Sequence, residues 1–209
     1  MKPPLPIPMS KRIFDIVIAL IITLLTSPFW LLVTAIIFLE HFFRGHPLDP
    51  LFYTETRISK GRPFTLYKFN IFDQRVIDTL RKKGVFIHTK KLEHAGKTIF
   101  VGKALRQIYM DELPQLFNVL RGDMSLIGPR PLNIEVCNSL SPNERVLERI
   151  PAGITGLFQS YKGSDGKTSK ELDAEYLHNF LTKSGFQLIS YDTKIIFRTL
   201  KVVLRSKGI

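Results

Sequence analysis

The sequence predicts an α+β protein in which a membrane-inserted helical hairpin precedes a small, mostly helical domain with a few short strands. Two observations predict this arrangement. The stretch from Ile16 to Leu39 carries no charged residue, and about 20 apolar residues suffice to cross a bilayer. Beyond it, segments whose apolar residues recur at helical spacing are interspersed with short, aromatic-rich segments that are typical of strands.

The apolar segment is expected to bend in its middle. Ser27 and Pro28 lie there, and a proline removes one helical hydrogen bond and pushes the preceding residue away from helical geometry. Basic residues stand on both sides, with Lys11 before the segment and Arg44 after it. Because positively charged flanks stay in the cytoplasm, both ends favour the same side. A re-entrant hairpin and a kinked single span both fit these residues.

Three regions follow from these patterns. Residues 1–10 are rich in proline and are expected to form a disordered tail. Residues 11–43 form the membrane segment, with its break at Ser27-Pro28. Residues 44–209 are expected to form one domain, because no repeat and no low-complexity linker divides them.

Inside that domain, strands are predicted at residues 51–53 and 64–69, on either side of a basic, turn-prone stretch at 57–63. Short extended pieces are expected at 125–131 and after the glycine-rich turn at 151–159. Helical packing is predicted at residues 105–121, with an irregularity near residue 111, and helices are predicted at residues 72–86, 170–180 and 191–207. The last of these is basic and amphipathic, which suits a membrane surface. A core-packed helix with a solvated basic face fits it equally well.

The charge of the chain points to an anionic partner. Lysine and arginine number 30 against 18 acidic residues in 209, a net charge of +12. Nucleic acid, anionic lipid and phosphorylated substrates all satisfy such a surplus. The single cysteine, Cys137, excludes an internal disulfide.

Two adjacent carboxylates, Asp111 and Glu112, are the candidates for chemistry. Asp111 is expected to cap the N-terminus of a helix that ends before Gly122. The helix dipole would favour the ionised form that a carboxylate nucleophile needs. Neighbouring carboxylates also invite Mg²⁺, a hard cation that prefers oxygen ligands and phosphate. Taken alone, however, an Asp-Glu pair at a helix start is more often a cap than a catalyst.

Arginines near this pair are candidates for gripping a diphosphate through forked hydrogen bonds. They are Arg106, Arg121 and Arg130. The stiff Gly-Pro-Arg-Pro turn would hold the backbone of Arg130. Such arginines are usually solvated surface charges, so they too leave the function open.

One long string decides between these interpretations. Residues 110–131 read MDELPQLFNVLRGDMSLIGPRP, which closely resembles the signature of the bacterial sugar transferase family, the monotopic phosphoglycosyl transferases. The resemblance continues in the segments at 11–15 and 151–159 and in the Ser27-Pro28 pair. It therefore covers nearly the whole chain. It implies a re-entrant membrane hairpin and a catalytic domain on the cytoplasmic face of the inner membrane, with interfacial amphipathic helices.

The resemblance also implies a mechanism. Asp111 would attack the sugar-bearing phosphorus of a UDP-sugar, UMP would leave, and undecaprenyl phosphate would then take the phosphosugar from the aspartate. Glu112 would assist, and Asp111 and Glu112 would hold Mg²⁺. Further substrate contacts are expected from Lys68, Arg57, Arg106, Arg130, Gln159, Lys162 and Asp173.

The chain departs from the family pattern after Gln159. The family shows a Gly-Arg pair there, whereas this chain reads Ser-Tyr-Lys-Gly-Ser, so that Lys162 is the available cation. Ala152 also replaces a proline of the family. Asp111 and Glu112 are unchanged, so the departures concern the choice of donor rather than the chemistry.

Two other functions fit parts of the sequence. A membrane-tethered basic module that binds nucleic acid would explain the charge, but Asp111, Glu112 and Asp123 lie among the basic residues and would repel phosphate. We therefore expect no nucleic-acid partner. A degenerate family member that acts as a scaffold is the second alternative. The sequence is compatible with a homo-oligomer without specifying one.

Overall fold

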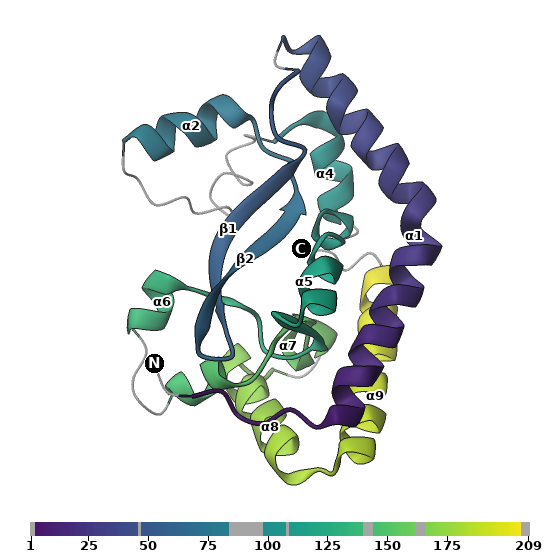
Figure 1. Ribbon diagram of the computed structural model, residues 1–209, viewed down its shortest axis with the longest axis vertical. Helices are drawn as coiled ribbons and strands as arrows, with labels where there is room; N and C mark the ends of the chain where they lie inside the picture. Colours follow the sequence, from purple (N-terminus) through teal and green to yellow (C-terminus); the bar gives the residue numbers. More distant parts are fainter. Residues whose placement is uncertain are drawn as a thin grey trace. The chain divides into compact units, whose positions relative to one another are not determined.

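The computed structural model describes residues 3–45, 47–83, 98–107, 109–139, 144–161 and 166–205 (Figure 1). Its elements, in chain order, are α1 (Met9–Phe43), β1 (Phe52–Ser59), β2 (Arg62–Phe69), α2 (Gln74–Lys82), α4 (Phe100–Gln107), the 3₁₀ turn η1 (Met110–Glu112), α5 (Gln115–Arg121), β3 (Met124–Ile127), β4 (Leu132–Asn133), α6 (Ile134–Ser139), the 3₁₀ segment η2 (Glu144–Arg149), β5 (Ala152–Thr155), α7 (Leu157–Tyr161), α8 (Ser169–Thr182) and α9 (Gly185–Leu204). The α+β class with few, short strands is confirmed.

The apolar segment forms one helix without an interruption. α1 runs for 35 residues and includes Pro28. The helix continues through Ser27 and Pro28 without a non-helical joint, and the expected bend there stays a prediction. Proline costs one hydrogen bond of the helix, and apolar helices tolerate this where neighbouring groups satisfy the freed backbone. The re-entrant topology stays a prediction.

The chain folds as two compact units that both include part of α1. Unit 1 comprises Met1–Leu25, Thr54–Tyr67 and Pro114–Ile209, and unit 2 comprises Thr26–Tyr53 and Lys68–Leu113. The units therefore do not follow the division at residue 43 that the sequence suggests. The strands β1 and β2 also contribute residues to both.

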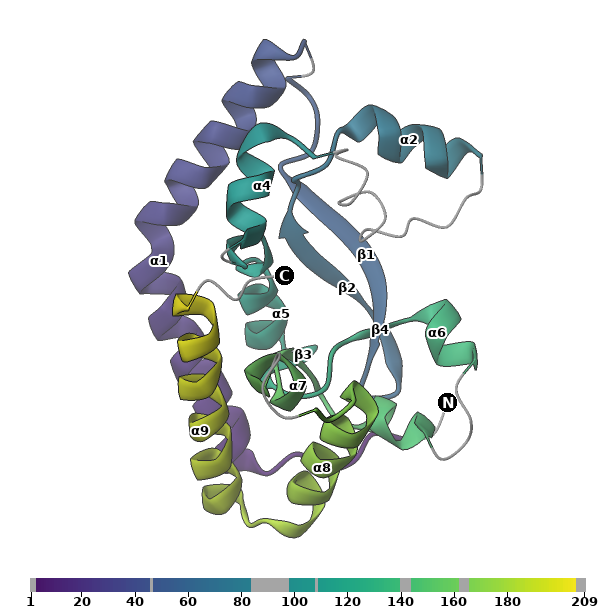
Figure 2. The same ribbon diagram turned by 180° about the vertical axis from the view of Figure 1, so that it is seen from behind.

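In unit 1, short strands provide the framework. β1 lies between β2 and β4 in a three-stranded sheet, and β1 pairs with β4 in antiparallel fashion (Figure 2). Lys60 and Gly61 connect β1 to β2 with φ angles of 53° and 68°, which is the left-handed geometry of a tight hairpin turn. The basic stretch at 57–63 is thus mostly strand, and its turn is only two residues long. β3 and β5 form a separate parallel pair.

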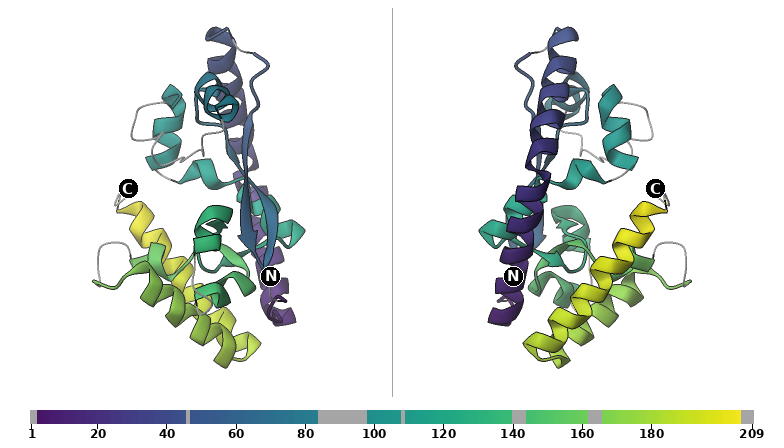
Figure 3. Two further views of the ribbon diagram at one scale, coloured as in Figure 1. Left: turned by 90° about the vertical axis from the view of Figure 1, so that its left-hand side faces the viewer. Right: turned by 90° about the vertical axis from the view of Figure 1, so that its right-hand side faces the viewer.

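The C-terminal helices of unit 1 form a hairpin. α8 begins at a capping box made by Thr168 and Glu171, in agreement with the helix predicted at 170–180. α9 follows after a short turn, and α7 lies between the two arms (Figures 2 and 3). α9 buries Leu188, Asp192 and Ile195. It exposes Phe197, Leu200 and Leu204, so it has both a packed face and an apolar outer face.

Unit 2 has its own apolar core. Val33 and Ile37 of α1 are buried in it, together with Tyr53, Phe69, Ile71, Phe72, Ile77, Ile99 and Leu105. Aromatic rings make specific contacts there: Trp30 meets Phe69 edge-on at 5.5 Å between ring centroids, and Phe52 stacks on Phe69 at 5.7 Å. This core supports α4, which leads into η1.

The burial of α1 follows a spacing of four residues. Lys11, Asp15 and Ala19 are buried in unit 1. Val33, Ile37 and His41 are buried in unit 2. The other faces are apolar and exposed, with Leu24 at 71% and Leu31 at 75% exposure. Within the described residues, α1 is the single helix long and apolar enough to cross a membrane.

Candidate active site

Asp111 and Glu112 lie on the 3₁₀ turn η1 in unit 2. Tyr109, just before the turn, has a left-handed backbone with φ of 57°, which is uncommon for a residue other than glycine. Asp111 is buried, and only 5% of it is exposed. α5 begins only at Gln115, after Pro114 at its N-cap. The prediction that Asp111 caps this helix is therefore wrong. The dipole of α5 does not act on Asp111 from the N-cap position, as the prediction had assumed.

A lysine is paired with the second carboxylate. The Lys68 Nζ donates to Glu112 Oε1 at 2.8 Å, and both side chains are less than one-fifth exposed. Lys68 comes from β2 and Glu112 from η1, so the pair joins two segments of unit 2. An ion pair with little access to water is stronger than one at the surface. Lys68 was expected to contact the substrate, which stays a prediction, and the structure shows that it also contacts Glu112.

The helix α4 supports this turn from the N-terminal side. Glu40 of α1 accepts hydrogen bonds from the backbone N–H groups of Phe100 at 2.6 Å and Val101 at 3.2 Å. Arg44 holds the Glu40 carboxylate at 2.8 Å. A carboxylate at the first N–H groups of a helix stabilises that helix. Arg106 lies in the last turn of α4, and it therefore shares unit 2 with Asp111, Glu112 and Lys68.

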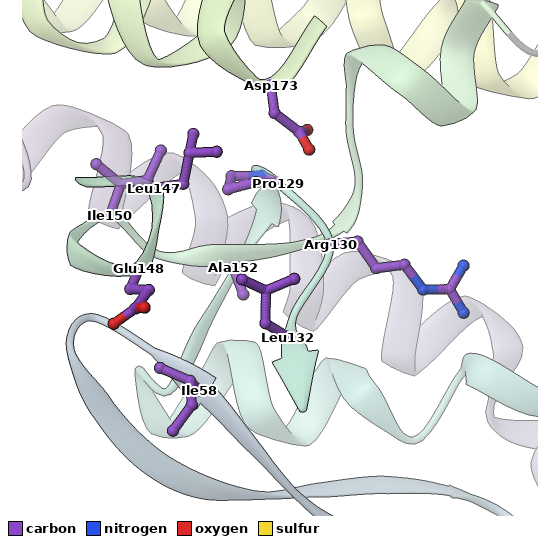
Figure 4. A pocket seen from close by; sticks show the side chains of 9 residues that line it. All are labelled: Ile58, Pro129, Arg130, Leu132, Leu147, Glu148, Ile150, Ala152 and Asp173. Carbon is purple, nitrogen blue, oxygen red and sulfur yellow. The ribbon is translucent and has the colours of Figure 1, made fainter. Parts of the chain in front are cut away.

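A second group of predicted residues lies in unit 1. Arg130 and Asp173 line one pocket, together with Ile58, Pro129, Leu132, Leu147, Glu148, Ile150 and Ala152 (Figure 4). Asp173 extends from α8 towards the Pro129–Arg130 turn, whereas the guanidinium of Arg130 points away from the pocket. Burial raises the pKa of Asp173 to about 6, and a hydrogen bond from Ser169 acts in the opposite direction. The structure thus brings these two residues together.

The turn that carries Arg130 is tightly built. Gly128 N donates to Thr155 O at 3.0 Å, and Gly153 N donates to Pro129 O at 2.9 Å. A Cβ on Gly153 would lie 2.1 Å from Gly128 N, and one on Gly128 would lie 2.4 Å from Pro151 O. Glycine is required at both positions because the two backbones approach so closely.

The remaining predicted contacts are placed differently. Arg57 is engaged within the protein, since its guanidinium donates to Glu55 at 2.8 Å and to Pro131 O at 3.2 Å. It braces the Arg130 turn rather than offering a free cation. Gln159 lies half-buried on α7. Lys162 lies outside the described residues.

Several residues that the sequence did not single out also have clear roles. Arg12 of α1 donates to the carbonyls of Val119 at 2.6 Å and Leu120 at 2.9 Å, and Lys60 donates to the Gly122 carbonyl. Cations at these last carbonyls stabilise the end of α5. The expected stop at Gly122 is confirmed, with φ of 86°. In the sequence, Lys11 and Arg12 are charges that precede the apolar segment. In the structure, both make hydrogen bonds inside unit 1.

Asp111 and Glu112 are the residues of η1 that would hold a magnesium ion, and this cofactor stays a prediction. Mg²⁺ keeps several waters and is held by one or two carboxylates together with substrate phosphates. The adjacent Asp111 and Glu112 would supply that number of ligands. In the described part of the chain, no group of three or more His, Cys, Asp and Glu side chains is placed to hold a metal ion, so an ion here would need the substrate to complete its shell.

Several known proteins are similar to this chain. The family model described as bacterial sugar transferase matches residues 7–206. The exopolysaccharide production protein ExoY of Sinorhizobium fredii is 31% identical over 210 residues, which are 95% of this chain and 87% of that protein. The undecaprenyl-phosphate galactose phosphotransferase of Salmonella typhimurium is 32% identical over 95% of this chain and 41% of its own length.

A third relative has another printed substrate. The UDP-glucose:undecaprenyl-phosphate glucose-1-phosphate transferase of Klebsiella pneumoniae is 31% identical over 91% of this chain and 39% of that protein. The match to the family model spans almost all residues, including the Asp111–Glu112 turn and the Arg130 turn. This chain belongs to the bacterial sugar transferase family.

Proposed function

We propose that the protein transfers a sugar-1-phosphate from a UDP-sugar to undecaprenyl phosphate, as the initiating step of a cell-surface glycan. The observation that carries this proposal is the η1 turn, where the buried Asp111 adjoins the Lys68–Glu112 ion pair. Relatives that act on undecaprenyl phosphate, by their names, match at about 30% identity over most of the chain. Their names include galactose, N-acetylgalactosamine and glucose, so the family leaves the sugar open.

The reaction proceeds in two displacements. An oxygen of Asp111 attacks the sugar-bearing phosphorus of the donor, the bond from this phosphorus to the bridging oxygen breaks, and UMP leaves with the electron pair. An aspartyl-phosphosugar results. A phosphate oxygen of undecaprenyl phosphate then attacks the same phosphorus, and the carboxylate of Asp111 is restored. A carboxylate nucleophile divides one difficult transfer into two easier ones.

The other residues of unit 2 orient and neutralise charge. Lys68 holds Glu112 and brings positive charge to the turn that carries Asp111, where the donor phosphates would gather negative charge. Arg106 is assigned to phosphate binding. Mg²⁺, held by Asp111 and Glu112, would supply further charge neutralisation on the diphosphate. In unit 1, Arg130, Gln159, Lys162 and Asp173 are assigned to the donor.

The architecture of α1 supports a monotopic position in the membrane. The N-terminal half of α1 is packed into unit 1 and its C-terminal half into unit 2. β1 runs from one unit into the other, and Glu55 and Arg57 lie along it. A polar strand of this kind does not cross a bilayer, so both ends of α1 belong on one side. A catalytic domain on the cytoplasmic face would let a soluble donor and a lipid acceptor reach the same aspartate.

Release of UMP tests the proposal directly. Membranes that contain the full chain are incubated with undecaprenyl phosphate, Mg²⁺ and single UDP-sugars, and UMP is measured. We expect one donor or a few to give UMP, and Asp111→Asn to abolish it. The aspartyl-phosphosugar should appear by intact-protein mass spectrometry when the acceptor is left out. Full activity of Asp111→Asn, or no UMP with any donor, contradicts the proposal, and the latter outcome favours a scaffold.

A further inference from the structure

A buried polar network joins three helices of unit 1. Lys11 of α1, Tyr176 of α8 and Asp192 of α9 are each no more than 1% exposed. Lys11 Nζ donates to Asp192 Oδ2 at 2.5 Å, and the Tyr176 hydroxyl lies 3.2 Å from Asp192 Oδ1. Asp15 completes the network at 3.7 Å from Lys11. Buried charges persist in a fold when they are paired and hydrogen-bonded in this way.

The proton positions in this network follow from its surroundings. Burial and the neighbouring Asp192 raise the pKa of Tyr176, so its hydroxyl keeps its proton and acts as a donor. Burial raises the pKa of Asp192 to about 6, although Lys11 acts to lower it. Asp192 is therefore mostly ionised at neutral pH. It accepts from Lys11, and the single proton of the Tyr176 hydroxyl is shared between Asp192 and the closer Ile127 carbonyl.

The network ends on the backbone of β3. The Tyr176 hydroxyl lies 2.9 Å from the carbonyl oxygen of Ile127, and Lys11 Nζ reaches the same oxygen at 3.5 Å. Ser125 Oγ also donates to it, at 2.9 Å. Leu126 N donates to Asp15 at 3.3 Å. Two successive residues at the end of β3 are thus held by side chains of the network.

Arg130 follows three residues after Ile127, on the turn already described. Its side chain is exposed, so the position of its guanidinium depends on the backbone that carries it. Arg57 holds the far end of the turn through the Pro131 carbonyl. β5 holds its middle through Gly128 and Pro129. The Tyr176 hydroxyl holds its near end.

We propose that Lys11, Tyr176 and Asp192 are positioning residues that fix the Gly128–Arg130 turn for binding of the donor. The inference rests on the proposed function, in which Arg130 contacts the donor phosphates. A cation that is held in place before binding loses less entropy when the ligand arrives. Loss of the Tyr176 hydroxyl removes one of the two 2.9 Å donors to the Ile127 carbonyl and loosens the turn at its start.

A double-mutant cycle tests whether Tyr176 acts through Arg130. Tyr176→Phe, Arg130→Ala and the double variant are assayed in membranes for UMP release, with whichever UDP-sugar the wild type uses. We expect Tyr176→Phe to raise KM for the donor about fivefold and to leave kcat within about twofold. In the Arg130→Ala background the same substitution should change KM by less than about twofold, because the group that Tyr176 positions is gone.

Tyr191→Phe is the matched control. Its ring stacks on Tyr176, and its hydroxyl makes hydrogen bonds with Asn179 at 3.2 Å and Glu175 at 3.5 Å, both on α8. We expect it to leave KM unchanged. Equal effects of Tyr176→Phe in both Arg130 backgrounds, a fall in kcat alone, or an equal effect of Tyr191→Phe would overturn the inference.

Two further measurements keep the result decisive. If Tyr176→Phe does not fold, as judged by its thermal melt, Ser125→Ala replaces it in the same cycle, since Ser125 donates to the same carbonyl. The same background dependence is expected, and its absence overturns the inference. No UMP from the wild type with any donor would instead count against the proposed function itself.

Discussion

Among the individual residues, Glu112 and Lys68 have the most defined partnership. Their contact of 2.8 Å is partly screened from water, and it lies on the turn that carries Asp111. Glu112 therefore serves two purposes in the proposed mechanism. It orients Lys68 beside the nucleophile, and it supplies an oxygen for Mg²⁺.

The substitution Lys68→Met removes the ammonium group and with it the ion pair to Glu112. We expect kcat/KM for UMP release to fall about 10- to 100-fold, since a hydrogen bond to a charged group contributes about 1.5–3 kcal/mol. Lys103→Met is the control, because Lys103 is exposed on α4 in the same unit. A loss no greater than that of Lys103→Met would refute this role.

Asp173 makes the stability of the protein depend on pH. Its pKa is about 6 in the folded protein against 3.8 as the ordinary value, so the folded state binds more protons between these values. The free energy of unfolding therefore falls as pH rises from about 4 to about 6, and the contribution is lost above that range. Asp173→Asn should flatten this part of the profile.

Thermal melts of wild type and Asp173→Asn at pH 4.5 and 7.5, in one detergent, measure this difference. The drop in Tm between the two pH values should be smaller in the variant. Ser169→Ala is a companion variant. The Ser169 hydroxyl donates to Asp173 Oδ2 at 3.3 Å and so stabilises the charged form of Asp173. Loss of this hydroxyl should enlarge the drop. Identical profiles for all three proteins would disprove the assignment.

At the scale of elements, local signals predicted many boundaries. Gly122 ends α5 where a glycine stop was expected, and α8 begins at a Thr-x-x-Glu capping box. The η1 turn was not predictable in the same way. It depends on the left-handed Tyr109 and on α4, whose first N–H groups are capped by Glu40 from a segment 60 residues earlier. Sequence spacing contains no signal for such a distant cap.

In the candidate site, too, some residues were named from local sequence, whereas their long-range contacts were not. The signature string singled out Asp111, Glu112 and Arg130 as candidates, and their roles stay predictions. Arg57 was expected to contact substrate, yet it binds Pro131 O, 74 residues away. The buried network of Lys11 and Asp192 joins residues 181 positions apart. Long-range pairs of this kind follow from the fold and not from local pattern.

The parallel pair β3–β5 gives a test at the element scale. Gly153→Ala places a Cβ 2.1 Å from Gly128 N and 2.4 Å from Thr155 O, so the strands must separate. We expect a loss of about 1–3 kcal/mol or more in stability, and a loss of activity with it. Gly166→Ala is the control, since nothing lies within 4 Å of its added Cβ although its φ is 68°. The prediction fails if Gly153→Ala melts no lower than Gly166→Ala.

At the scale of the whole molecule, α1 belongs to both units. Each half is buried on one stripe and apolar on its other faces. In our proposal, both ends of α1 face the same side of the membrane. This distinguishes a re-entrant segment from a spanning anchor.

Accessible tags at the two termini test this topology. In right-side-out and inverted vesicles, both tags should react from the cytoplasmic face only. A control protein with one established membrane-spanning helix should show its two tags on opposite faces. Tags of the present chain on opposite faces would rule out the re-entrant segment.

The burial pattern of α1 has a practical meaning for protein engineering. Removal of the first 43 residues would take Lys11, Asp15 and Ala19 from one core and Val33 and Ile37 from the other. The helix thus contributes side chains to the cores of both units. A water-soluble version would have to keep the helix and replace its exposed apolar residues by polar ones. Leu24 and Leu31 are suitable first positions, because both side chains are largely exposed.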